Sequence, residues 1–232
     1  AIAGVDKEEA FDITPYAHAF FEYFLRNPIC QEMGRKFKVA FSSNDSDNAL
    51  GFMHDIGLIP KIQNGVKGFK VLVAGGLGSQ PMLAYDAFDF IPTNELIPFA
   101  EAVIRVFDRH GERTSRGKAR MKFLIKKIGY EAFVQLVEEQ KSAVINKKVE
   151  ISEDGFDADL SVLKTSFEQE PPVDEEAYKK WAATNVIDQK QDGYKAVAIR
   201  LTLGNLYNDT ARALAAIVKE GFAADDIRVS VN

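Results

Sequence analysis

GRKFKVAFSS, residues 34–43, alternates apolar and basic side chains along its length. Successive side chains of a β-strand point to opposite faces, so this alternation predicts a strand over residues 36–42. One face carries Phe37, Val39 and Phe41, and the other carries Lys36, Lys38 and Ala40. Two ammonium groups therefore project together, with Arg35 at the mouth of the strand. Paired cations indicate an anion site, although alternating lysines also protect edge strands from aggregation.

The flanking sequence predicts a sheet with helices packed on it. Two further strand-like stretches, separated by turn-rich loops, lie at 51–62 and 68–76. Helical spacing of apolar residues and capping residues at the ends predict helices at 14–27, 93–111, 115–129 and 130–144. Residues 80–92 are irregular in pattern, and no element is predicted there.

A second unit follows an acidic segment. Residues 149–180 show no sustained period and are predicted to be a linker. A strand at 194–204, an amphipathic helix at 208–222 and a strand at 227–232 then form a βαβ-like unit. We therefore predict an α+β protein in which a mixed sheet flanked by helices (1–148) is joined by an acidic linker (149–180) to an incomplete half-domain (181–232).

The composition is that of a globular protein. Hydrophobic residues make up 46% of the 232 residues, and 17 phenylalanines are ample for a core. The acidic start does not resemble a secretory signal, and no run of about 18 apolar residues occurs, so we expect a cytoplasmic protein without a membrane span. Cys30 is the only cysteine, which excludes an internal disulfide, a cysteine-based zinc site and a self-contained iron–sulfur cluster. His18, His54 and His110 lack metal-ligand spacing, so no metal site is predicted.

The net charge of −5 hides a sharp asymmetry. Nine Lys/Arg and two acidic residues lie within 105–127, whereas ten acidic residues and one lysine lie within 150–176. A helix beginning near Ser115 places Arg116 with Arg120 on one face and Lys118 with Lys122 on another. Such rows suit carboxylates or phosphates. A solvated helix, or a nucleic-acid-binding surface over 113–127, is the alternative, and the overall acidity argues against nucleic acid.

A glycine-rich turn, VAGGLGSQ (73–80), directly follows an apolar strand. Glycines there allow backbone N–H groups to approach an anion or a flat ligand closely. The turn matches neither a dinucleotide-binding fingerprint nor a P-loop, and an ordinary turn is the alternative interpretation.

Taken in order, several motifs resemble one known family. They are RKFKVAFS (35–42), HDIG (54–57), GFKVLVAGGLG (68–78) and FIPTNELIPFAEAVIRVFDRHGERTSRGKARMKFLIKKIG (90–129). The series resembles the sirohaem-binding region of the ferredoxin- or flavoprotein-dependent nitrite and sulfite reductases. Residues 1–17 are similar to the family segment just before it, and residues 193–222 resemble the ferredoxin-like half-domain that follows.

The resemblance implies a role for each basic residue. Members of this family pass six electrons from an external donor, through a 4Fe-4S cluster and sirohaem, onto sulfite or nitrite. Lys36 and Lys38 would face the substrate anion and supply positive potential and protons. The implied contacts to the carboxylate-rich sirohaem come from Arg35, Gly75, Gly76, Gly78, Arg113, Arg116, Lys118, Arg120 and Lys122. Ala74 stands where the family often has a third glycine.

Two departures from the family limit what this chain is expected to do alone. The cluster cysteines, in C-x5-C and C-x3-C pairs, and the upstream substrate arginines are absent. We therefore expect an inactive internal piece of a longer reductase that carries neither cofactor by itself, with weak affinity for polycarboxylates or oxyanions retained in its basic cluster. The longer protein would use ferredoxin or a flavoprotein as donor, with no nucleic-acid or membrane partner. The interrupted half-domain suggests self-association.

Three questions stay open at this point. The motifs do not separate nitrite from sulfite as the substrate. A non-catalytic module that binds anions or nucleic acid through 113–127 is one alternative function. An enzyme that uses the lysine pair on a phosphorylated substrate is another.

Overall fold

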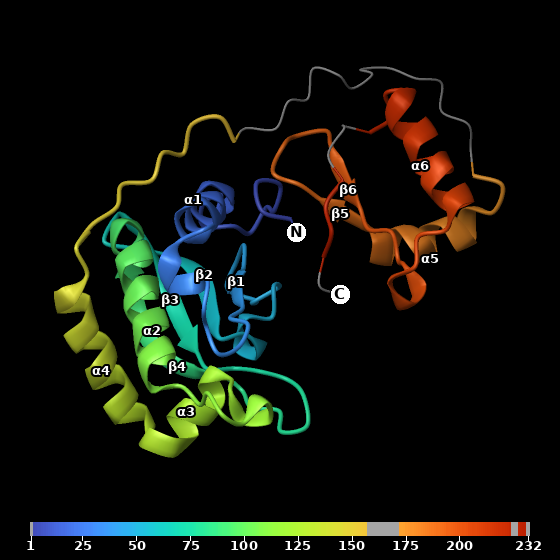
Figure 1. Ribbon diagram of the computed structural model, residues 1–232. Helices are drawn as coiled ribbons and strands as arrows, with labels where there is room; N and C mark the ends of the chain where they lie inside the picture. Colours follow the sequence, from blue (N-terminus) through green and yellow to red (C-terminus); the bar gives the residue numbers. More distant parts are fainter. Residues whose placement is uncertain (1, 157–171, 224–226, 231–232) are drawn as a thin grey trace.

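A four-stranded mixed sheet forms the centre of the first unit (Figure 1). The computed structural model describes residues 2–156, 172–223 and 227–230. The strands lie in the order β1 (Val39–Phe41), β2 (Ile56–Gln63), β3 (Val66–Val73) and β4 (Tyr85–Pro92). β1 pairs with β2 in parallel, and the other pairings are antiparallel.

Four α-helices pack around this sheet: α1 (Thr14–Phe24), α2 (Leu96–His110), α3 (Met121–Ile128) and α4 (Tyr130–Ala143). Short 3₁₀ turns occur at Pro28–Cys30, Gly51–Met53, Thr93–Glu95 and Arg116–Lys118. In Figure 1, α2 lies between the sheet and α4. Eleven residues of α2 are buried, as expected for a helix that is covered on more than one side. The core of the unit is therefore built around α2.

The second unit is much less compact. It contains α5 (Glu175–Asn185), β5 (Val186–Asp188), β6 (Lys195–Val197), a 3₁₀ turn at Thr202–Gly204 and α6 (Asn208–Lys219), with β5 and β6 antiparallel. None of the described residues from 172 onward is buried. The unit contacts the start of the chain through Lys190, whose backbone N–H donates to Val5 O at 2.9 Å and whose ammonium pairs with Glu9 at 2.7 Å.

The predicted class, an α+β protein with a mixed sheet flanked by helices, is confirmed. β5 (Val186–Asp188) was not predicted, and neither was β4, which lies within residues 80–92. Its register against β3 shifts at two points, so the side chains do not keep the period of two that identifies a strand. Within the described part of the chain, no helix is both long and apolar enough to cross a membrane.

Several other predicted elements differ in extent, β1 and α3 among them. β1 begins at Val39 rather than at residue 36, because the Lys38 N–H donates to the Asp55 carboxylate and not to a strand. α3 begins at Met121 and not near Ser115, because Arg120 is extended, with ψ of 153°. The predicted faces pairing Arg116 with Arg120 and Lys118 with Lys122 are therefore wrong.

The acidic segment and the C-terminus also depart from prediction. α5 begins inside the predicted linker, where the Asp174 carboxylate caps it by accepting the Ala177 N–H at 2.9 Å. Residues 227–230 of the predicted strand 227–232 are not a strand, and residues 231–232 lie outside the described residues. The proposed division at 148 and 180 stays a prediction.

Candidate functional site

The two lysines of the opening stretch lie where the alternation predicts. Lys36 and Lys38 are exposed, whereas Phe37 between them is half-buried and packs on Phe107, with ring centroids 5.7 Å apart. Neither ammonium group has a hydrogen-bond or ion-pair partner among the residues that the structure describes. Both charges are therefore free to attract an anion from solvent.

The backbone beneath the lysines is fixed by a buried carboxylate. Asp55 is 1% exposed, and its Oδ2 accepts the Lys38 N–H at 2.8 Å. Arg120 donates to the same carboxylate, from Nη2 to Oδ2 at 2.7 Å and from Nε to Oδ1 at 3.3 Å. Burial raises the pKa of Asp55, and the Arg120 guanidinium and the Lys38 amide only partly oppose that shift. The carboxylate thus connects Lys38, just before β1, to Arg120, just before α3.

The glycine-rich turn packs directly against this region. A Cβ on Gly75 would lie 2.3 Å from Phe52 O and 2.9 Å from His54 O, so only glycine fits there. Ala74 is fully buried with φ of +67°, a conformation that glycine adopts without strain. Gly78 also has a positive φ, of +102°, in open space.

Lys122 holds the tip of the turn in place. Gly76 and Met82 exchange backbone hydrogen bonds at 2.9 Å in both directions, which closes a small loop. The Lys122 ammonium donates into this loop, to Gly76 O at 3.3 Å, Leu77 O at 2.8 Å and Gln80 O at 2.6 Å. Lys122 is 2% exposed, and burial lowers the pKa of its ammonium. All three donors of the ammonium are used, so Lys122 has no free donor in this arrangement.

The remaining predicted basic residues, Arg35, Arg113, Arg116 and Lys118, differ in how they are paired. Arg113 is engaged: it donates to Glu32 O at 2.7 Å and to Asp108 O at 2.9 Å, and it pairs with the Asp108 carboxylate. Arg116 and Lys118 are exposed, and their side chains have no partner within the described ranges. Arg35 differs again, because its Nε is buried and has no hydrogen-bond partner among those residues.

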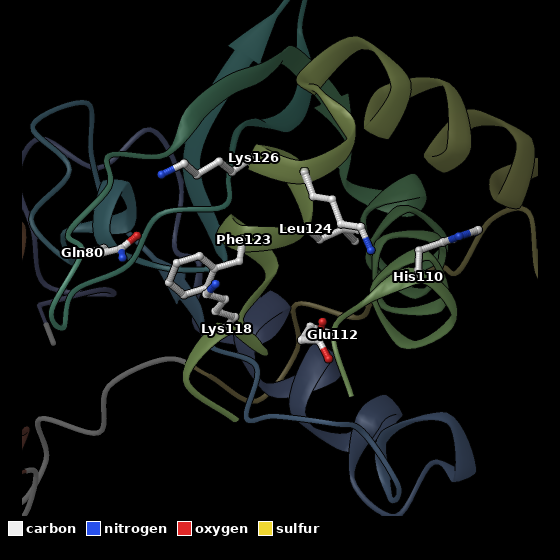
Figure 2. A pocket seen from close by; sticks show the side chains of 8 residues that line it. Gln80, His110, Glu112, Lys118, Phe123, Leu124 and Lys126 are labelled. Carbon is white, nitrogen blue, oxygen red and sulfur yellow. The ribbon is translucent and has the colours of Figure 1, made fainter. Parts of the chain in front are cut away.

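A pocket of about 360 Å³ lies beside α3. It is lined by Gln80, His110, Glu112, Lys118, Phe123, Leu124, Lys126 and Lys127. Figure 2 shows Gln80 and His110 at opposite ends of it, with Phe123 between them. The Glu112 carboxylate is occupied by hydrogen bonds from Thr114 and the Ser115 N–H, which hold its pKa at about 2. The pocket thus carries an excess of positive charge.

Nothing in the described ranges groups three or more His, Cys, Asp or Glu side chains so that they could hold a metal ion. Cys30 is free and partly buried, and burial raises the pKa of its thiol. One thiol cannot supply the roughly four thiolates that a 4Fe-4S cluster needs, so this chain does not fit that group by itself.

Sequence reasoning missed the Asp55 carboxylate and the internal contacts of Lys122. Asp55 belongs to the quoted HDIG motif, but the motif gave no role to its carboxylate. Lys122 was expected to contact a ligand, and its contacts with the backbone of the turn were not predicted. Both depend on partners at least 17 positions away in sequence, such as Lys38 for Asp55.

These features define an α+β module with exposed cations that have no partner among the described residues, Lys36, Lys38, Arg116 and Lys118. The family described as "Nitrite and sulphite reductase 4Fe-4S domain" matches residues 1–144. The chain belongs to this family.

Individual relatives agree with that assignment. The sulfite reductase (NADPH) hemoprotein beta-component of Shewanella sediminis is 34% identical over 125 residues, which are 50% of this chain and 22% of that protein. The chloroplastic ferredoxin–nitrite reductase of Oryza sativa is 25% identical over 240 residues, covering 99% of this chain and 36% of that protein. The solved structure of the Mycobacterium tuberculosis NirA protein superposes with a TM-score of 0.70 at 23% identity, covering 94% of this chain and 36% of that one. The chain thus spans between about a fifth and two fifths of the length of these proteins.

Proposed function

We propose that this chain forms one wall of a pocket in which a nitrite or sulfite reductase holds sirohaem and its anionic substrate. The observation that carries the proposal is the set of exposed cations, Lys36, Lys38, Arg116 and Lys118, that have no partner among the described residues. The buried, unpartnered Nε of Arg35 fits the same interpretation, since a ligand carboxylate would satisfy it. Family membership supplies the class of ligand.

Within this wall we assign the basic residues to two roles. Arg35, Lys36, Lys38, Arg116 and Lys118 have donors to spare and would bind the anions. Arg113, Arg120 and Lys122 use their donors on the protein and would hold the wall together. Gly78, which has open space at its Cβ position, would let the flat cofactor approach the backbone, and Gly75 and Gly76 would keep the turn packed on the protein.

Lys36 and Lys38 would bind sulfite or nitrite and lower the energy of the negative charge on its oxygens. Their ammonium groups could also deliver protons as oxygen leaves as water. Sirohaem, when bound, would supply the iron centre through which the electrons reach the anion.

This chain alone would not catalyse the reduction. Its single cysteine cannot ligate the cluster, so cluster ligands would have to come from residues outside this sequence. Ferredoxin or a flavoprotein would be the electron donor, and the choice between nitrite and sulfite is left open. The cytoplasmic location stays a prediction from the sequence.

Self-association is a further element of the proposal. Large apolar side chains on the second unit are exposed, among them Trp181 (45%), Val197 (53%) and Leu206 (47%). Exposed apolar surface of this kind favours association with a covering partner.

The test is a visible-absorption titration of the purified chain with sirohaem. We expect a shifted cofactor band in the wild type, and about tenfold weaker binding in Arg116→Ala/Lys118→Ala, because two charge-assisted contacts are lost. The matched control is Lys179→Ala/Lys180→Ala, which removes two exposed lysines from α5 and should leave the affinity unchanged.

Sulfite added to the loaded protein should then perturb the band in the wild type and not in Lys36→Ala/Lys38→Ala. A wild-type chain that leaves the sirohaem spectrum unchanged at all concentrations would disprove the proposed function of this wall.

A further inference from the structure

We infer that Asp55 is a positioning residue that keeps Lys38, Arg120 and the glycine-rich turn in register. The inference rests on the proposed function, because it assigns a purpose to the geometry of that same wall. Asp55 touches no solvent-exposed ligand site itself and acts through the groups that it holds.

The first contact fixes the backbone of Lys38, the residue just before β1. The Lys38 N–H donates to the Asp55 carboxylate at 2.8 Å, and the Ile56 N–H donates back to Lys38 O at 3.1 Å. Residue 38 is thus held on both of its backbone polar groups by residues 55 and 56. Because the backbone of Lys38 is held in this way, the Cα–Cβ bond from which its side chain projects has a defined direction.

The second contact fixes the start of α3. Arg120 is the extended residue just before the helix, and both Nη2 and Nε of its guanidinium donate to Asp55. The Asp55 side chain is 1% exposed and that of Arg120 is 15% exposed. A carboxylate this deeply buried requires a paired cation, so Arg120 is committed to it. The exposed segment with Arg116 and Lys118 is therefore anchored at its C-terminal end.

The third contact, made by the backbone of residue 55 and therefore independent of its side chain, connects the same residue to the glycine-rich turn. The Ala74 N–H donates to the backbone carbonyl of Asp55 at 2.8 Å. Gly75 then packs on the backbone of residues 52 and 54, with no space for a side chain. One residue therefore connects the three segments that carry the lysines, the glycines and the basic turn.

The test compares Asp55→Asn with Asp45→Asn in the full 232-residue chain by amide hydrogen exchange in NMR. Asp45 is a suitable control, since its carboxylate also pairs with a lysine, Lys61 at 3.0 Å, but is 72% exposed. In Asp55→Asn we expect the Lys38 amide to exchange about tenfold faster, because a neutral oxygen replaces the carboxylate acceptor. The Val71 amide, in the centre of the sheet, should keep its wild-type rate in both variants.

Two results would overturn the inference. An unchanged exchange rate of the Lys38 amide in Asp55→Asn means that the carboxylate does not fix the backbone at residue 38. An equal acceleration at Lys38 and Val71 means that Asp55 serves global stability and has no specific positioning role.

Asp55→Asn leaves the Arg120 charge without its partner and could prevent folding. The double variant Asp55→Asn/Arg120→Gln replaces the ion pair with two amides that can hydrogen-bond each other, and it should show the same selective acceleration at Lys38. Sirohaem affinity, measured in parallel, separates the two proposals. A wild-type chain that does not bind sirohaem refutes the proposed function. The exchange rate of the Lys38 amide still decides whether Asp55 fixes the backbone at residue 38.

Discussion

The two units of this chain have similar helical patterns and very different interiors. In α2, Ile97 is 1% exposed and eleven residues of the helix are buried. In α6, Ile217 is 45% exposed and no residue is buried. An amphipathic sequence predicts that a helix forms, but burial depends on what packs against it. The residues of the proposed wall, Arg35, Lys36, Lys38, Arg116 and Lys118, all belong to the unit that has a core.

Matched isoleucine substitutions should give the largest difference between the units. Ile97→Ala should lower the free energy of unfolding by about 4 kcal/mol, since it leaves a cavity at a fully buried position. Ile217→Ala should cost less than about 1 kcal/mol, because nearly half of that side chain is already in water. Urea denaturation followed by far-UV circular dichroism measures both.

Fluorescence sharpens this comparison, because the single tryptophan, Trp181, lies in α5 of the second unit. Its urea transition should not move in Ile97→Ala. A shared transition that moves with Ile97 would mean that the two units unfold as one.

Substitutions in the glycine-rich turn should give an intermediate effect. Gly75→Ala places a methyl group 2.3 Å from Phe52 O and should cost about 3 kcal/mol through forced backbone movement. Gly78→Ala has open space and should cost only about 1 kcal/mol, from the strain of a positive φ. Equal destabilisation in thermal melts of the two variants would contradict the close packing described for Gly75.

The smallest expected effect concerns two exposed carboxylates, one in each unit. The pKa of Glu112 is lowered from 4.5 to about 2, first by the Thr114 hydroxyl and then by backbone N–H groups of its turn. The pKa of Asp188 is lowered from 3.8 mainly by Lys195. Because both folded values lie below the unfolded ones, each group stabilises the fold above its unfolded pKa. That contribution is lost as the pH falls through the folded value, from 4.5 to about 2 for Glu112.

Salt distinguishes the two causes. Carbon-13 NMR titration in about 0.5 M salt should raise the pKa of Asp188 toward its usual value, because an exposed ion pair is screened. Glu112 should stay near 2, since its hydrogen bonds are local. An equal shift of both groups would contradict the assigned causes.

The sequence predicted what depends on local pattern. Alternation placed Lys36 and Lys38 on the exposed face, and helical spacing identified α2 and α4. The family resemblance, carried by motifs in a fixed order, was confirmed for residues 1–144.

What the sequence could not predict depends on contacts between distant segments. Asp55 and Arg120 are 65 positions apart, and nothing in either local pattern pairs them. Their ion pair coincides with an extended Arg120, so the helix predicted from Ser115 begins only at Met121. β4 was missed for a related reason, since its bulged pairing with β3 is set by the neighbouring strand.

The central claim is that the proposed wall lies on the first unit and takes a carboxylate-rich macrocycle. Hydrogen–deuterium exchange of the chain with and without sirohaem, read by mass spectrometry, tests it most directly. We predict slower exchange on addition of sirohaem in three segments, residues 34–41, 74–80 and 113–122, with no change in 175–219. Unchanged exchange throughout the chain, or protection confined to 175–219, would contradict the account.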